Sequence, residues 1–198
     1  MPTSLSVRTK ALVTVAAVGA TAAVAGLGTF SQFNSMTNVS SNVSSGTINI
    51  SLGAGGTIAS GVSGLLAGDS HEMTVDVVNG SAGIGQISLT AASSASTPSL
   101  LTQAGGLQVG VQSCPAAWTV SGTLYTCGSG TPATVLTTQD VAALSSPQTL
   151  ANLNLANGAT NHLLFTLTLP SSVGDTYQGL SDTIAWTFTA VQRAGTNV

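Results

Sequence analysis

The stretches HLLFTLTL, residues 162–169, and TIAWTFT, residues 183–189, decide the fold class of this 198-residue chain. Apolar residues recur at every second position, and the first stretch places Leu163, Phe165, Leu167 and Leu169 on one side of an extended chain. The second does the same with Ile184, Trp186 and Phe188. A period of two is typical of a β-strand with one buried face. Both stretches are therefore predicted to be strands with one face in the core.

Shorter stretches repeat this alternation, with Gly, Pro, Asn or Ser clusters between them, around residues 47–52, 73–77, 87–91 and 107–111. One segment, TTQDVAAL at 137–144, favours a short helix capped by Thr137 or Thr138. About eight short strands without long helices indicate an all-β fold, an antiparallel β-sandwich of jelly-roll or related Greek-key type. Residues 112–133 are expected to form an elaborated connection on this sandwich.

The N-terminus has the pattern of a secretory signal peptide at residues 1–31. Arg8 and Lys10 are followed by ALVTVAAVGATAAVAGLG at 11–28, which carries no charge. The run is short and rich in small residues for a permanent span, so a signal helix that is cleaved is predicted, with a retained membrane anchor as the alternative. A polar arm at 32–45 and one domain at 46–198 follow, which places the protein outside the cell or on its surface.

Charge excludes several classes of partner. After residue 31 the chain has one basic side chain, Arg193, and six acidic ones, a formal net charge of −5. Binding to nucleic acid or to an anionic membrane surface needs clustered Lys and Arg. We therefore expect no nucleic-acid partner, and membrane contact only through an uncleaved signal segment. A hydrophobic content of 43% with 5% charged residues also argues against disorder. A surface with so few charged side chains lacks the repulsion that keeps domains apart, and it is common in proteins that associate with copies of themselves.

Two cysteines, Cys114 and Cys127, lie 13 positions apart. In an exported chain such a pair is expected to form a disulfide. A reactive thiol would need a nearby base or cation to lower its pKa, and the sequence has no His, Lys or Arg between residues 72 and 161. A structural disulfide is therefore predicted.

Sequence motifs for catalysis are scarce. There is no Gly-x-Ser-x-Gly elbow and no phosphate-binding Gly-rich loop ending in Lys-Ser or Lys-Thr. His71 and Glu72 begin an HExxH-like pattern that the next residues do not complete, and His162 is the other imidazole. Zinc needs three or four convergent ligands, so His71, Glu72 and His162 are weak metal candidates beside the interpretation that they are ordinary surface residues. No catalytic residue and no cofactor is predicted.

Four segments together resemble the TasA and camelysin family of exported bacterial proteins. They are GLGTFSQFN at 26–34, SSGTINIS at 44–51, LLAGDSHEMTVDVVNGS at 65–81 and TYQGLSDTIAWTFTAVQ at 176–192. Within the third segment, Gly68-Asp69 resembles the family's turn before a strand, and Asn79-Gly80 resembles its closing turn. The segments occur in the family's order across nearly the whole chain.

The resemblance implies a jelly roll and cleavage between Ser31 and Gln32 by a dedicated signal peptidase. It also implies a structural function, because TasA-like proteins form fibres of the biofilm matrix in which the N-terminal segment of one subunit completes the sheet of the next. Here the corresponding arm carries four apolar side chains for burial, Phe33, Met36, Val39 and Val43. Camelysin implies the alternative, a cell-surface metallo-endopeptidase, but the resemblance supplies no metal ligands. The chain differs from TasA in being shorter, poorer in Lys and equipped with two cysteines.

Overall fold

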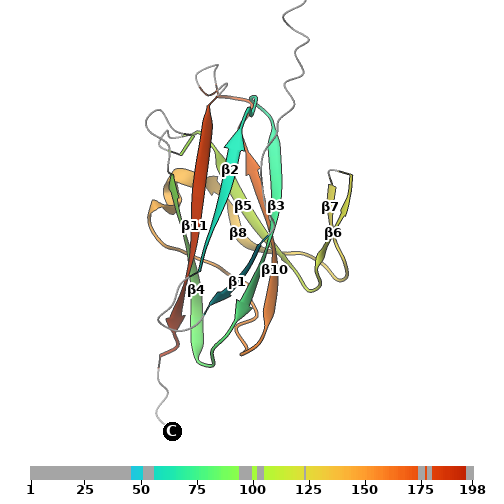
Figure 1. Cartoon of the computed structure of the whole chain (residues 1–198), viewed down its shortest axis with the longest axis vertical. Coiled ribbons are helices and arrows are strands. Elements are labelled where there is room, and N and C mark those ends of the chain that lie inside the picture. The colour runs from blue at the N-terminus through green and yellow to red at the C-terminus, as the bar shows by residue number, and fades with distance from the viewer. Residues whose placement is uncertain are drawn as a thin grey trace, which may run out of the picture. The chain divides into compact units, whose positions relative to one another are not determined.

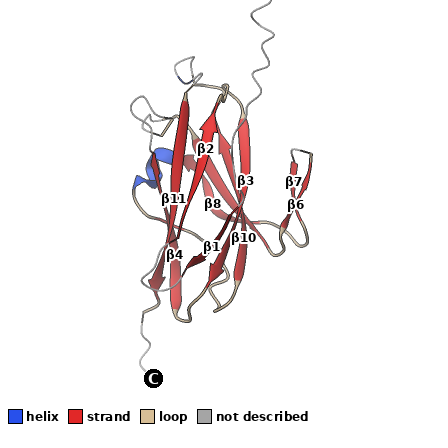
Figure 2. Cartoon of the chain, viewed as in Figure 1, coloured by secondary structure: helices blue, strands red, loops and turns tan. Residues whose placement is uncertain are grey.

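The structure is a computed structural model, and its strands dominate the described part of the chain (Figures 1 and 2). The predicted signal peptide and arm, residues 1–45, lie outside that part. The described residues belong to one compact unit. They are 46–50, 56–93, 100–101, 105–122, 124–173, 177 and 180–194.

Eleven strands and one short 3₁₀ helix, η1 (Val141–Ser145), make up the secondary structure of these residues. The strands are β1 (Gly46–Ile50), β2 (Gly56–Ser63), β3 (Ser70–Asn79), β4 (Ile84–Ser93), β5 (Gln108–Cys114), β6 (Trp118–Ser121), β7 (Leu124–Cys127), β8 (Ala133–Asp140), β9 (Gln148–Thr149), β10 (Thr160–Thr168) and β11 (Ser181–Gln192). The predicted all-β class is confirmed.

Ten of the strands form a nested set of antiparallel pairs. β6 pairs with β7, and around this hairpin β5 pairs with β8, β4 with β9, β3 with β10, and β2 with β11. The outer pairs alternate between two sheets, of order β1-β3-β10-β5-β8 and β2-β11-β4-β9. A long hairpin rolled up in this way is a jelly roll, one of the two topologies that the sequence left open and the one that the family resemblance implies.

The two sheets share one hydrophobic core, built from the inward face of each strand. Aromatic side chains join the sheets at its centre. The ring of Phe165 on β10 lies edge-on to Trp186 and Phe188 on β11, with centroid distances of 5.3 Å and 6.2 Å. Such pairs stabilise by about 0.5–1.5 kcal/mol beyond the burial of their area. The buried indole N–H of Trp186 donates to Ser60 Oγ at 2.8 Å, so it keeps a hydrogen-bond partner.

The six strands expected from alternation are confirmed as β1, β3, β4, β5, β10 and β11. Strand β2 was not predicted, because its sequence GTIASGVS is rich in Gly and Ser and shows little alternation. It becomes a strand because β11 supplies a partner along its whole length, from Ser181 opposite Ser63 to Phe188 opposite Gly56. Tertiary pairing therefore overrides a weak local signal.

The predicted helix at 137–144 is wrong over its first half. Residues 137–140 belong to β8, where Gln139 pairs with Val109 and Asp140 with Gln108. The β-branched Thr137 and Thr138 suit a strand better than a helix. Only residues 141–145 turn into the helix η1, whose N-cap is Asp140 and not a threonine. The Asp140 carboxylate instead accepts a hydrogen bond from the backbone N–H of Gly105.

The connection predicted at 112–133 exists, although its first residues, 112–114, complete β5. Its central part is the β6–β7 hairpin, which pairs with neither large sheet (Figure 1).

Candidate functional site

Strand β1 is the part of the fold that bears most directly on assembly. It belongs to none of the nested pairs and lies at the edge of the five-stranded sheet, parallel to β3, with Gly46 opposite Val75 and Ile50 opposite Asn79. Its inward side chains Ile48 and Ile50 are 7% and 0% exposed. This short N-terminal strand is therefore added to a roll that is already closed by antiparallel pairs, yet it covers part of the core.

The edge of β3 is covered over half its length. β1 pairs with residues 75–79, whereas within the described part of the chain no strand pairs with residues 70–74 on the same side. The turn that precedes this open half is fixed: Gly68 has a φ of 95°, and the carboxylate of Asp69 accepts the N–H of Leu66 at 2.9 Å. A strand edge that the described strands cover over only half its length is a site where a further strand can be added.

The three weak metal candidates do not come together. His71 and Glu72 are neighbours in β3, and neighbours in a strand point to opposite faces. Glu72 shares the outer face with His162, but the strand register places it opposite Thr166, four residues along β10 from His162. Among the described residues no group of three His, Cys, Asp or Glu side chains is close enough to hold a metal ion. The protease alternative therefore stays a prediction without assigned ligands.

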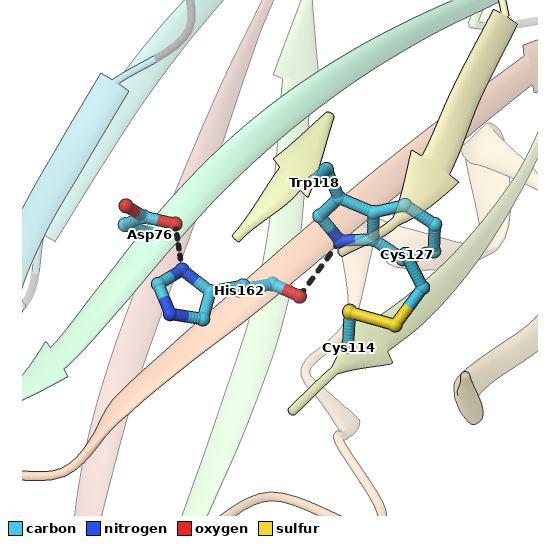
Figure 3. Close-up of polar contacts among 5 residues, drawn as sticks. All are labelled: Asp76, Cys114, Trp118, Cys127 and His162. Atoms are coloured by element: carbon cyan, nitrogen blue, oxygen red, sulfur yellow. Dashed lines mark hydrogen bonds and ion pairs between the residues drawn. A yellow bond between two sulfur atoms is a disulfide. The ribbon is translucent and has the colours of Figure 1, made fainter. Parts of the chain in front are cut away.

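His162 instead contacts Asp76, a residue that the sequence did not single out. Its ring nitrogen Nδ1 donates to Asp76 Oδ1 at 2.7 Å, and the two side chains are 20% and 40% exposed (Figure 3). The strand register brings them together, because His162 on β10 lies directly opposite Asp76 on β3. Such a pairing between residues 86 positions apart depends on sheet topology, which no local motif reveals.

The predicted disulfide between Cys114 and Cys127 is present and closes the base of the β6–β7 hairpin. Trp118, at the start of β6, donates its indole N–H to the backbone carbonyl of His162 at 2.9 Å, so a second contact fastens the hairpin to β10 (Figure 3). Val120 and Leu124, near the tip, are 57% and 61% exposed. The hairpin is thus anchored at its base and open to solvent at its end.

The remaining predicted positions lie outside the described residues. They are the cleavage site at Ser31 and Gln32 and the apolar arm residues Phe33, Met36, Val39 and Val43. In the described ranges no helix is long and apolar enough to cross a membrane.

No known family model matches the chain, and no curated protein is significantly similar to it. The resemblance to the TasA and camelysin family therefore stays a prediction.

His71 should make the stability of the fold depend on pH. Burial lowers the pKa of its imidazole, an effect that the neighbouring Glu72 carboxylate partly opposes. As the pH falls below about 6.5, the unfolded chain takes up a proton that the folded chain resists, so the free energy of unfolding decreases. Urea unfolding between pH 8 and 5 should show this decrease in the wild type and in His162→Gln, but not in His71→Gln. An equal decrease in His71→Gln would contradict the assignment.

Removing the disulfide should destabilise the protein. Replacing both cysteines, Cys114→Ser with Cys127→Ser, frees a loop whose closure in the unfolded chain is worth about 3 kcal/mol. Urea unfolding measures the loss of stability. In hydrogen exchange, the increase in rate from the wild type to the variant should be larger at Thr119 and Tyr125 in the hairpin than at Phe165 in the core. An unchanged free energy of unfolding, with unchanged exchange in the hairpin, would show that the Trp118 contact alone holds it.

Proposed function

We propose that this protein is an exported structural protein that assembles into homopolymers by strand addition, with the N-terminal segment of one copy completing the five-stranded sheet of the next. The observation that carries the proposal is β1, a parallel strand added at the edge of β3 outside the nested pairs. The four sequence segments that resemble the TasA and camelysin family support the same function.

A strand of this kind can be exchanged between copies. Its contacts are the β3 ladder and the burial of Ile48 and Ile50, and the backbone N–H of Gly80 donates to the carbonyl of Ile50 at 2.8 Å. An identical segment from a second copy makes identical contacts, which is the basis of domain swapping. Exchange leaves the antiparallel roll of both copies intact.

The open half of the β3 edge gives the arm a place to bind. In the proposed assembly the incoming segment continues the register of β1, in which Gly46 lies opposite Val75. Residues 41–45 then run along residues 70–74, with which no described strand pairs on that side. Strand addition obtains its affinity from main-chain hydrogen bonds, so it needs no charged partner.

The edge strand β1 lacks the usual protection against such pairing. Natural sheets blunt their edges with charged side chains, especially Lys, or with Pro. The sequence of β1, GTINI, contains none of these residues, and the uncovered half of β3, SHEMT, has one charged side chain, Glu72, and neither Lys nor Pro. A sheet edge with so little charge suits a protein that pairs with copies of itself.

Cysteine cross-linking tests whether β1 is exchanged. Asn49 and Val78 lie opposite each other in the β1–β3 ladder, on the outward face. In the double variant Asn49→Cys with Val78→Cys, exchanged strands place the two new thiols on different copies. Oxidation of the assembled sample should therefore give a ladder of covalent multimers on non-reducing denaturing gels, whereas strands kept within each copy give covalent monomers.

The single variants Asn49→Cys and Val78→Cys are the controls. Each has one new thiol, so neither can give products larger than dimers. Covalent monomers from a polymerised sample of the double variant would overturn strand exchange.

A further inference from the structure

A pocket of about 330 Å³ opens at the base of the β6–β7 hairpin. The end of β5, the connection from β7 to β8, and the loop before β10 meet there. The volume is at the lower end of the range for ligand sites, roughly 300–1,000 Å³. Its polar lining comes from Ser113, Thr131, Asn152, Asn154, Thr160 and Asn161.

Asparagine side chains fix the shape of this pocket. Asn161 is 5% exposed and uses both ends of its amide on Asn154: its Oδ1 accepts the backbone N–H at 2.7 Å, and its Nδ2 donates to the carbonyl at 3.0 Å. Asn152, with a left-handed φ of 54°, donates from Nδ2 to the carbonyl of Thr134 at 2.8 Å. The wall is therefore held in place before any ligand binds, which reduces the ordering cost of binding.

Several polar groups of the lining keep capacity for a ligand. Asn152 Nδ2 and Asn154 Oδ1 are used, the first on the carbonyl of Thr134 and the second on the N–H of Ala156. The other end of each amide, Asn152 Oδ1 and Asn154 Nδ2, makes no hydrogen bond within the described part of the chain. The hydroxyls of Ser113, Thr131 and Thr160 have no hydrogen-bond partner within the described part of the chain. Hydroxyls both donate and accept, so the pocket offers both kinds of group.

The lining carries no charged side chain among the described residues. The remaining wall is formed by Pro115, Ala133 and Cys114, which is part of the disulfide. A cation or a phosphate would find no opposite charge there, and a purely apolar ligand would leave the hydroxyls and amides unpaired. A ligand with several uncharged hydroxyls and an apolar face matches both parts of the wall.

We propose that this pocket binds a neutral sugar residue, a hexose or an N-acetylhexosamine. Its hydroxyls bond to the Asn, Thr and Ser side chains, and its apolar face lies against Pro115 and Ala133. No β1 residue lines the pocket, so sugar binding is independent of the strand exchange proposed above and can be tested separately.

Nuclear magnetic resonance of the folded protein tests the proposal. Glucose, galactose, mannose and N-acetylglucosamine are titrated one at a time, followed by short neutral oligosaccharides of whichever sugar binds. At least one sugar should shift the signals of Thr131, Asn152, Asn154 and Thr160 in a saturable way. Tighter binding of the oligosaccharide than of the free sugar identifies a glycan chain as the source, and equal binding identifies the free sugar.

Matched variants locate the site. Thr160→Val keeps the shape of the side chain and removes its hydroxyl, so it should weaken binding roughly two- to tenfold. Thr131→Trp, at an exposed position in the loop, should fill the pocket and abolish binding. Thr137→Val is the control, because Thr137 is exposed on β8 and does not line the pocket.

Three results would overturn the proposal. The first is that no sugar shifts the lining residues up to its solubility limit. The second is that binding is unchanged in both Thr131→Trp and Thr160→Val. The third is that an uncharged peptide rich in Gly, Ser and Asn shifts these residues whereas every sugar fails to do so, which would assign the pocket to a peptide.

Discussion

The contact of Phe165 with Trp186 and Phe188 is the interaction on which the rest of this structure depends. Phe165 belongs to the central strand of the five-stranded sheet, and its two partners belong to β11 of the other sheet. All three side chains are fully buried. Because β10 and β11 also pair with β3 and β2, this one contact fixes how the outer turns of the roll lie against each other.

Two elements of the roll lie at its periphery. β1 lies at one edge of the five-stranded sheet, outside the nested pairs, and the β6–β7 hairpin forms the innermost turn of the roll but pairs with neither sheet. The disulfide and the Trp118 contact hold the hairpin at its base, beside the uncharged pocket. The core therefore provides stability, and both proposals, strand exchange and sugar binding, use regions at the periphery: the edge strand and the base of the hairpin.

Local patterns predicted the fold class and six strands, because alternation such as that of Leu163, Phe165 and Leu167 is visible in a short stretch of sequence. They did not predict β2, whose strand character comes from its pairing with β11, and they wrongly predicted a helix for the second half of β8. Contacts between distant residues were not predictable. The pairing of His162 with Asp76 depends on strand register, which a single sequence does not encode locally. The pocket depends on how the loop before β10 folds back on β8 and β10, which no local pattern shows either. Residues that are adjacent in sequence also need not share a site: His71 and Glu72 are neighbours in β3 but point to opposite faces of the sheet.

In the proposed polymer the N-terminal segment links one copy to the next. Electron microscopy of the purified chain beginning at residue 32, compared with a chain beginning at residue 44, shows whether it does. We expect fibres from the longer chain. The shorter chain keeps β1 but lacks the arm that would extend this strand along residues 70–74 of the next copy, so we expect folded monomers with an unchanged β-sheet circular dichroism spectrum. Identical fibres from both chains would contradict the proposal, because the polymer would then form without the arm.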